Sequence, residues 1–370
     1  MTPSSAPPQW VVTLGDSYIS GEGARWAGNS TESVRRVDAL GADAYLDVRH
    51  ERESQPGCHR AEDSIAELDY ANVRGVNLAC SGATVLSHGQ GKAFKPGLDS
   101  YSDHNGHVGQ VAALRRFAES HDVTAVVISI GGNDFGFGSV LGRCVAGFLL
   151  TVGPSPQYCS DDPEVTSNFS APRVQAVAEQ IAAALGRVST AMSRAGYRPG
   201  GYRMVVLNYP SPVPSGPAFR YPETLRARYT VGGCPLFDAD ATWAASALGA
   251  VNAAVRTGVL RSGLANVSLL DMSRAFVGHR LCERGVGQLE EVGLTSWREA
   301  AAVDQMEWVS KLGVSWLPWQ LQESVHPGYF GMLAERSCVR QALRRTSRPV
   351  SRCVIARGGL LAGEPVMALR

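Results

Sequence analysis

Residues Trp10–Tyr18 read WVVTLGDSY, a short and almost wholly apolar run that passes directly into Gly-Asp-Ser. A run of this kind is typical of a parallel β-strand that is covered on both faces of its sheet. Four further runs repeat the pattern, and we predict a strand in each: Val73–Leu78, Ala125–Ile130, Tyr202–Leu207 and Val267–Leu270. The sequence therefore predicts a five-stranded parallel sheet.

The segments between these strands carry apolar residues at three- and four-residue spacing, as amphipathic helices do. The predicted helices are Ala61–Ala71, Val108–Ser120, Pro172–Ala195 and Ala239–Arg261. Strands that alternate with helices through right-handed crossovers give an α/β fold, here a three-layer α/β/α sandwich. No Pro/Ser-rich linker interrupts the alternation, so we expect residues 1–370 to form a single domain.

Two stretches do not fit this compact pattern, and we interpret them as insertions at about 25–57 and 278–322. The first is polar and charged. The second is rich in tryptophan: Trp297, Trp308, Trp316 and Trp319. Ser296 and Glu299 have the spacing of a capping box, which predicts a helix from there to about Lys311. This second insertion is either a lid or substrate wall, or additional packing at the edge of the sheet.

The charge balance lacks the electrostatic signature of a nucleic-acid-binding protein. Lys and Arg total 35 against 34 Asp and Glu, which leaves a net charge of +1. The Arg-rich stretch at 344–352 is interpreted as a solvated helix end and loop. No apolar run reaches the roughly 18 to 20 residues that a membrane span requires, so we expect no transmembrane segment.

Eight cysteines, none of them in a Cys-x-x-Cys pair, favour disulfides over a metal site. The alternative is eight buried thiols in a cytosolic protein. The most economical pairing is sequential: Cys58–Cys80, Cys144–Cys159, Cys234–Cys282 and Cys338–Cys353. Met1–Gln9 has neither the basic nor the apolar segment of a secretion signal, so the protein is leaderless or its leader was removed. The cysteines favour removal, and we expect a secreted, extracellular protein.

The loops that follow the predicted strands carry the chemically useful residues. In an open parallel sheet, ligands bind outside the carboxyl ends of the strands. Three such loops and one downstream segment are therefore expected to meet in one crevice: Gly15-Asp16-Ser17-Tyr18, Ala79–Thr84, Gly131-Gly132-Asn133-Asp134 and Ser324–Gly328.

In these segments the sequence resembles the SGNH (GDSL-type) hydrolase family, whose markers are Ser, Gly, Asn and His, one in each of four blocks. The matching residues, in order within about residues 10 to 335, are Ser17, Gly82, Asn133 and His326. The string at Asn77–Thr84 is most similar to disulfide-containing secreted esterases and lipases of actinobacteria. The resemblance implies the flavodoxin-like fold of that family, and it supports sequential pairing of the first six cysteines.

The four marker residues supply what acyl transfer requires: a nucleophile, a base and donors for a developing oxyanion. We expect Ser17 to be the nucleophile and His326 the general base that takes its proton. The oxyanion would be held by the backbone N–H groups of Ser17 and Gly82 and by the side-chain amide of Asn133.

The third member of a catalytic triad departs from the family pattern. The family commonly places Asp three residues before the catalytic His, where this chain has Glu323. Either Glu323 accepts from the second imidazole nitrogen, or a backbone carbonyl near Trp319 or Gln320 does so. Asp16 and Asp134 belong to their blocks, and we expect them to hydrogen-bond neighbouring loop amides.

These features predict a serine esterase or lipase that hydrolyses carboxylic esters through an acyl-enzyme. A carbohydrate or natural-product O-deacylase, or a phospholipase, would use the same machinery, and a binding module that retains the fold is the non-enzymatic alternative. The apolar segment Phe135–Leu150 forms either a groove for an acyl chain or a buried helix tied down by Cys144. We expect a monomer that acts on small-molecule or lipid esters and requires no metal or cofactor.

Overall fold

The computed structural model describes residues 7–30, 32–68, 72–151, 155–224, 226–312, 322–345 and 350–370. Within these residues a seven-stranded sheet has the order β2-β1-β3-β4-β5-β6-β7. All neighbouring strands are parallel except β6 and β7, which pair antiparallel. The strands are β1 (Gln9–Gly15), β2 (Val73–Asn77), β3 (Asp122–Ser129), β4 (Arg203–Leu207), β5 (Val267–Asp271), β6 (Val350–Leu361) and β7 (Glu364–Leu369).

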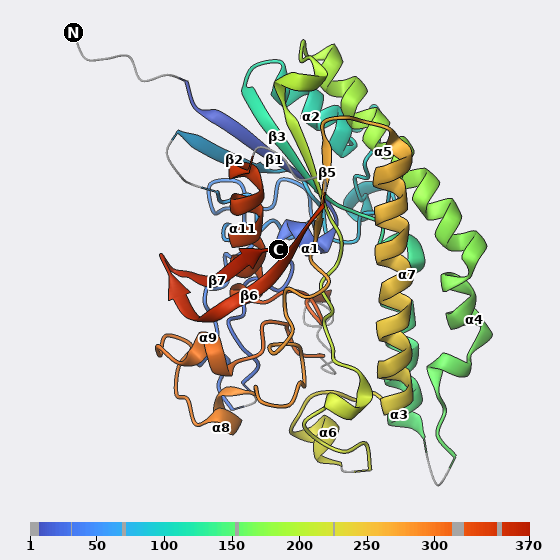
Figure 1. Ribbon diagram of the computed structural model, residues 1–370, viewed down its shortest axis with the longest axis vertical. Coiled ribbons are helices and arrows are strands. Elements are labelled where there is room, and N and C mark those ends of the chain that lie inside the picture. The colour runs from blue at the N-terminus through green and yellow to red at the C-terminus, as the bar shows by residue number, and fades with distance from the viewer. Residues whose placement is uncertain are drawn as a thin grey trace.

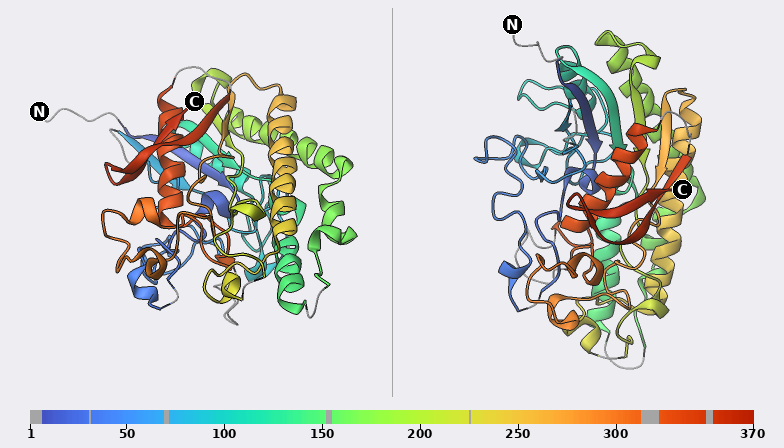
Figure 2. Two further views of the ribbon diagram at one scale, coloured as in Figure 1. Left: turned by 60° about the horizontal axis from the view of Figure 1, so that its bottom comes forward. Right: turned by 60° about the vertical axis from the view of Figure 1, so that its left-hand side comes forward.

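The predicted α/β class is confirmed and all five predicted strands are present, but the prediction of a five-stranded, wholly parallel sheet is wrong. The sheet continues into a hairpin of β6 and β7, which lies beside α11 (Tyr329–Arg344) (Figure 2). The hairpin turn, Ala362-Gly363, has φ values of 52° and 82°, as a tight two-residue turn requires. Two adjacent glycines, Gly358 and Gly359, interrupt the apolar pattern of β6 and conceal it in the sequence.

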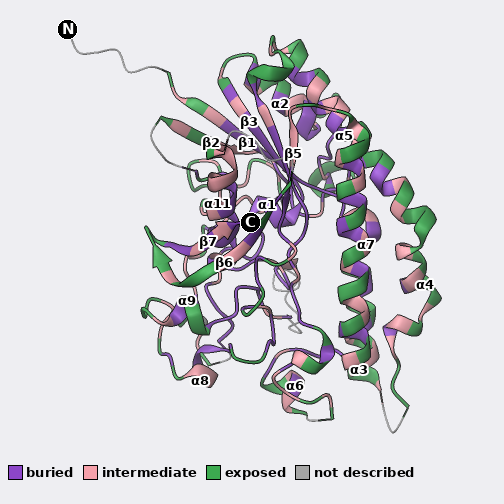
Figure 3. Cartoon of the chain, viewed as in Figure 1, coloured by how far each residue is buried: buried purple, intermediate pink, exposed green. Residues whose placement is uncertain are grey.

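Three of the four predicted helices between strands are present as α2, α5 and α7. The helices are α1 (Ser17–Ser20), α2 (Gln110–Ala118), α3 (Phe137–Leu150), α4 (Pro163–Thr166), α5 (Ala171–Arg194), α6 (Ala227–Thr230), α7 (Asp238–Ser262), α8 (Leu289–Val292), α9 (Ala302–Gln305) and α11. The apolar spacing that predicted the three long ones corresponds to the buried stripe of each helix. Figure 3 shows buried and exposed residues alternating along α5 and α7.

The predicted helix Ala61–Ala71 is wrong over its described part, because residues 61–68 form turns. Its apolar residues Ile65 and Leu68 are buried without a helix, since the chain passes close over β2. A Cβ added at Gly75 would lie 1.6 Å from the carbonyl oxygen of Ala66. Close approach to the sheet edge therefore overrides the helical pattern here.

The predicted helix from Ser296 to Lys311 is also wrong. The Glu299 carboxylate does accept from the backbone N–H of Ser296, at 3.0 Å, as a capping box would predict. However, the only helix in this stretch of described residues is α9, after which the chain is extended and forms bridges from Met306 to Gly287 and from Val309 to Pro327. These tertiary pairings replace the helical hydrogen bonds.

The two faces of the sheet are covered differently (Figure 1). On one face, Val12, Leu14 and Ile128 pack in a core with residues of α2, α5 and α7. On the other face, Val11 and Val127 belong to a core that includes α11 and the irregular segments. Successive strand residues thus point to opposite faces, which explains why the strands are almost continuously apolar.

The two predicted insertions pack against each other. Asn29 Nδ2 donates to Glu307 Oε2 at 2.6 Å, and the backbone N–H of Trp297 donates to the carbonyl of Arg36 at 3.2 Å. Trp308 is 2% exposed and stacks on His279, with 4.1 Å between the ring centroids. The described tryptophans of this insertion therefore act in packing, whereas Trp316 and Trp319 lie outside the described residues.

The structure joins the eight cysteines in the four sequential pairs: Cys58–Cys80, Cys144–Cys159, Cys234–Cys282 and Cys338–Cys353. The first bridge ties the end of the 25–57 insertion to the loop after β2, and the last ties α11 to β6. No helix among the described residues combines the length and apolarity needed to cross a membrane.

Candidate active site

Ser17 lies at the carboxyl end of β1, where the chain turns sharply into α1. Gly15 makes this turn with φ 137°, and a Cβ there would lie 1.8 Å from the carbonyl oxygen of Ser129. Asp16 is the N-cap of α1 and accepts from the backbone N–H of Tyr18 at 3.1 Å. The loop is therefore held close to the end of β3, and glycine is required at its first position.

His326 approaches Ser17 from a segment far away in sequence, and its Nε2 lies 2.7 Å from Ser17 Oγ. The preceding residue, Val325, has φ 58°, which is a strained conformation for a β-branched side chain. Two hydrogen bonds hold it there: Tyr18 donates from its hydroxyl to the Val325 carbonyl at 2.8 Å, and the Val325 N–H donates to the carbonyl of Ser310 at 3.0 Å.

Burial lowers the pKa of His326, although nearby negative charge and backbone carbonyls act in the opposite direction. The imidazole is consequently neutral at neutral pH, the state in which it can accept a proton. Serine and histidine are thus within hydrogen-bond reach and in the protonation states that general-base activation of a hydroxyl requires.

The loops after β2 and β3 are joined to each other beside Ser17. Gly82 has φ 78°. Asn133 donates from Nδ2 to the carbonyl of Ala83 at 2.9 Å, which fixes the orientation of its amide and leaves the second amide hydrogen available. The carboxylate of Asp134 accepts from the N–H of Val85 at 3.1 Å. The loop-amide contacts expected of Asp16 and Asp134 are therefore present.

Tyr209, at the carboxyl end of β4, connects these loops to the Ser17 turn. Its hydroxyl accepts from the N–H of Gly132 at 2.8 Å and donates to the carboxylate of Asp16. Burial raises the pKa of Asp16 to about 7, and burial likewise raises the pKa of Asp134 to about 6. Both acids are in a low-dielectric environment, and each accepts a hydrogen bond from a loop amide.

Glu323 does not contact His326 as a triad acid would. Its Oε2 accepts from Trp26 Nε1 at 2.8 Å and its Oε1 from the Tyr45 hydroxyl at 2.6 Å. His326 Nδ1 has no hydrogen-bond partner within the part of the chain that the structure describes. Of the two alternatives left open for the acceptor, the Glu323 carboxylate is not hydrogen-bonded to His326 in this structure, because the insertion supplies two donors that bind it. The alternative acceptors near Trp319 and Gln320 lie outside the described residues.

One cavity brings the predicted residues together. A space of about 460 Å³ is lined by Ser17, Gly82, Asn133 and His326. Apolar side chains from α3 and α7 form much of its wall: Phe137, Leu141, Val145, Leu248 and Val251. A second, smaller cavity of about 60 Å³ shares four of these five residues and continues between the two helices towards Phe169, Leu236 and Trp243. The apolar stretch after Asn133 therefore lines the cavity, while Cys144 on the same helix is buried in a disulfide.

Among the described residues, the group of His, Cys, Asp and Glu that comes close enough to hold a metal ion is Cys144, Cys159 and Asp240. Both sulfurs are in a disulfide, and the Asp240 carboxylate accepts from the N–H groups of Cys159 and Ser160 at 3.2 and 2.9 Å. The disulfide bond occupies the two sulfurs and the N–H groups occupy the carboxylate oxygens, which are the atoms that would act as metal ligands.

Sequence analysis missed several residues that shape the site. Gln110 is 1% exposed, and its side-chain amide both donates to the carbonyl of Gly15 at 2.8 Å and accepts from its N–H at 2.7 Å. Tyr209 and Tyr18 were likewise not singled out. No local pattern marks these side chains, since each acts through a partner more than ninety positions away in the chain.

Two solved structures are similar to this chain over most of its length. The chain is similar in structure to the extracellular lipase of Streptomyces rimosus, with a TM-score of 0.46 and 19% sequence identity over 90% of this chain and 98% of the lipase. It is similar to phospholipase A1 of Streptomyces albidoflavus, with a TM-score of 0.46 and 18% identity over 91% and 99% of the two chains. No curated protein matches the sequence.

The sequence family described as GDSL-like lipase/acylhydrolase matches residues 11–284, which is more than half of the chain. The matched residues include most of β1, all of β2 to β5, and the three loops that carry Ser17, Gly82 and Asn133. The chain therefore belongs to the GDSL-like lipase/acylhydrolase family and is an ester-hydrolysing enzyme.

Proposed function

We propose that this protein is a serine esterase or lipase in which Ser17 and His326 carry the reaction through an acyl-enzyme. The observation that carries this proposal is the 2.7 Å separation of Ser17 Oγ and His326 Nε2 at the wall of an apolar cavity. Ser17 attacks the ester carbonyl while His326 takes its proton. The imidazolium then protonates the departing alkoxide, and water hydrolyses the acyl-enzyme by the same steps with His326 again as the base.

The oxyanion of each tetrahedral intermediate is held by the backbone N–H groups of Ser17 and Gly82 and by the Asn133 side chain. Support comes from the position of all three residues on one cavity wall. The hydrogen bond from Asn133 Nδ2 to the Ala83 carbonyl fixes the orientation of the amide. The second N–H of this amide is then an uncharged donor with a set direction. Fixed donors of this kind stabilise developing charge more than water does, because they need no reorganisation.

The substrate is a hydrophobic acyl ester, with the acyl chain between α3 and α7. The wall contributed by Leu141, Leu248 and Val251 is apolar and continues into the second cavity. An acyl chain buried there gains about 0.8 kcal/mol for each methylene removed from water. A sugar acetate would leave this surface without a partner. We further infer one domain over residues 1–370 that acts as a monomer, and secretion, which four disulfides favour.

The test is hydrolysis of p-nitrophenyl esters of increasing chain length, together with labelling by a fluorophosphonate. We expect turnover and labelling of the wild type, and loss of both in Ser17→Ala. Activity is expected to extend to long acyl chains, and Leu248→Trp, which enlarges a side chain that lines both cavities, should depress long-chain turnover while butyrate is still cleaved. Leu248→Met is the matched control. Hydrolysis confined to acetate would favour a deacylase, and neither hydrolysis nor labelling would indicate a binding module.

A further inference from the structure

A buried carboxylate that the proposed reaction does not use lies beside His326. Glu22 is 0% exposed and follows α1, the short helix that begins at Ser17. Its neighbour Gly23 packs against the base, because a Cβ at Gly23 would be only 3.1 Å from the Cβ of His326. The backbone that carries Glu22 is thus adjacent to the backbone of His326.

Both carboxylate oxygens of Glu22 are hydrogen-bonded. Oε1 lies 2.9 Å from His59 Nδ1, and Oε2 accepts from Gln322 Nε2 at 3.0 Å. The same Gln322 nitrogen lies 3.2 Å from Ser81 Oγ. Glu22 therefore connects the segment after the nucleophile with the loop that precedes Gly82 and with the segment that precedes His326.

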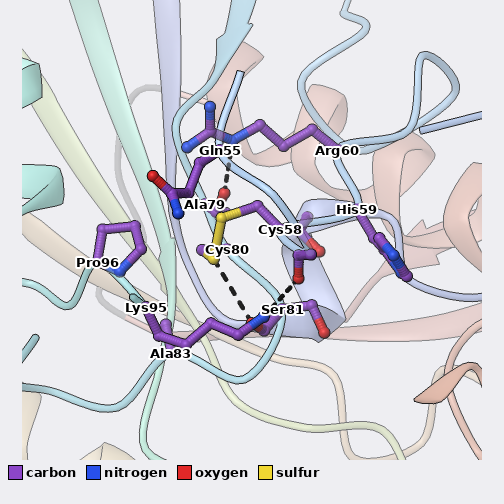
Figure 4. The surroundings of a disulfide bond; sticks show 12 residues. Gln55, Cys58, His59, Arg60, Ala79, Cys80, Ser81, Ala83, Lys95 and Pro96 are labelled. Carbon is purple, nitrogen blue, oxygen red and sulfur yellow. Dashed lines mark hydrogen bonds between the residues drawn. A yellow bond between two sulfur atoms is a disulfide. The ribbon is translucent and has the colours of Figure 1, made fainter. Parts of the chain in front are cut away.

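The disulfide Cys58–Cys80 reinforces this connection. His59 and Ser81 each follow one of its cysteines in the chain, and Figure 4 shows them on the two loops that the disulfide joins. The Ser81 N–H also donates to the carbonyl of Cys58 at 2.9 Å. The loops that carry His59 and Ser81 are thus joined covalently as well as by a hydrogen bond.

Glu22 is ionised in this environment. Burial raises its pKa, but the hydrogen bond and charge of His59, together with His326 and Ser81, outweigh burial and leave the pKa below its ordinary value. In return, Glu22 raises the pKa of His326 against the lowering effect of burial. The two groups therefore interact electrostatically, although neither is hydrogen-bonded to the other in the described structure.

The imidazolium that forms during catalysis lacks the usual carboxylate partner. Glu323 is occupied by Trp26 and Tyr45, and among the described residues no carboxylate is hydrogen-bonded to His326 Nδ1. A triad acid normally stabilises the imidazolium and fixes its orientation. Glu22 provides a negative charge beside His326, and hydrogen bonds with His59 and Gln322 hold its carboxylate in place.

We propose that Glu22 is a positioning residue for the ester hydrolysis proposed above, with its buried negative charge stabilising protonated His326 and its hydrogen bond to Gln322 holding the His326 and Gly82 segments together. Other titratable groups also surround the pair. They are Tyr18, Tyr45, Glu53, His59, Lys95 and Glu323. In its protonated form His59 has the opposite sign, and its charge lowers the pKa of His326 where Glu22 raises it.

The test is the apparent pKa of His326, measured by NMR in the resting protein and assigned with a His326→Gln variant. Glu22→Gln is expected to lower this pKa by about one pH unit and kcat by about tenfold, with KM within about threefold. The acid limb of the kcat profile should move to lower pH. His59→Gln removes the opposing charge and should raise the pKa instead. Glu53→Gln, which contacts the far side of His59, is the matched control and should change kcat less than about threefold.

An unchanged His326 pKa in Glu22→Gln would overturn the proposal, as would shifts of the same sign in the Glu22 and His59 variants, since these would indicate altered packing. If Glu22→Gln fails to fold, the upward shift in His59→Gln still decides whether the pair acts through charge. The titration requires no turnover. A wild type that hydrolyses no ester therefore overturns the proposed function by a separate measurement.

Discussion

The two sides of the candidate active site are built in different ways. On the sheet side, which comprises residues 15–18, 80–85 and 131–134, backbone groups connect the loops to the strand ends. The N–H of Asp16 donates to the carbonyl of Ser129 and the N–H of Cys80 to that of Gly15, at 2.9 and 3.0 Å. On the insertion side, which comprises residues 22–57 and 322–326, side chains join segments that are far apart in the chain.

This difference decides how each side responds to substitution. Backbone hydrogen bonds on the sheet side survive the replacement of a side chain, so a substitution there leaves the loops attached to the strand ends and removes only the contact of that side chain, such as that of Asn133 with Ala83. On the insertion side one hydroxyl or carboxylate joins two segments, as Tyr45 joins Gly23 to Glu323 at 3.2 and 2.6 Å. A substitution there shifts His326 and leaves its chemical groups intact.

The largest effect is expected on the sheet side, for Asn133→Ala. The variant loses one donor to the oxyanion, which should reduce kcat by about 10² to 10³ with little change in KM. The thermal midpoint should fall only slightly, because the side chain makes a single hydrogen bond within the described protein. Steady-state hydrolysis and thermal unfolding measure both. Asn105→Ala, on an exposed loop, is the control, and a loss below about fivefold in Asn133→Ala would exclude it from the oxyanion hole.

The same division determines what the sequence could predict. Each of Ser17, Gly82 and Asn133 follows a strand that is recognisable from its apolar run, and strands of a parallel sheet end at one edge. Local pattern and topology together were therefore sufficient to bring these three residues to one edge, but not to find Gln110 and Tyr209, which support their loops. The position of His326 relative to Ser17 followed from the family resemblance.

The insertion side could not be predicted in this way. Its contacts, such as those of Glu323 with Trp26 and Tyr45, join polar residues about 280 to 300 positions apart with no periodic pattern. The prediction for Glu323 used its spacing from His326 and could not include donors from a segment of irregular structure. The hairpin of β6 and β7 was missed for a related reason, since its glycines obscure an alternation that only pairing makes evident.

A smaller effect is expected on the insertion side, for Tyr45→Phe. Loss of the hydroxyl removes the hydrogen bonds to Gly23 and Glu323 and leaves a buried carboxylate oxygen without a donor, at a cost of about 1 to 3 kcal/mol in the free energy of unfolding. Because His326 loses support on both sides, we expect kcat to fall about tenfold. Denaturant unfolding and steady-state kinetics test this, with Tyr101→Phe on the surface as the control. Unaltered kcat alongside reduced stability would mean that the insertion does not position His326.

The smallest effect is expected for Glu323→Gln, although its position three residues before His326 would suggest the largest. The amide oxygen can accept from Trp26 and the amide nitrogen can donate to the Tyr45 hydroxyl, so both contacts survive and kcat should fall only a few-fold. Replacement of a triad acid would instead reduce kcat by about 10⁴.

Burial raises the pKa of Glu323 above its ordinary 4.5, so the folded wild type binds a proton more readily than the unfolded chain. The contribution of Glu323 to wild-type stability must then fall as pH rises above about 4.5, and the variant should lack this loss. Thermal midpoints of the two proteins that diverge in favour of the variant between pH 4 and 7, with near-equal turnover, are the expected result. A thousand-fold loss of turnover would return Glu323 to the triad and remove the distinction between the two sides.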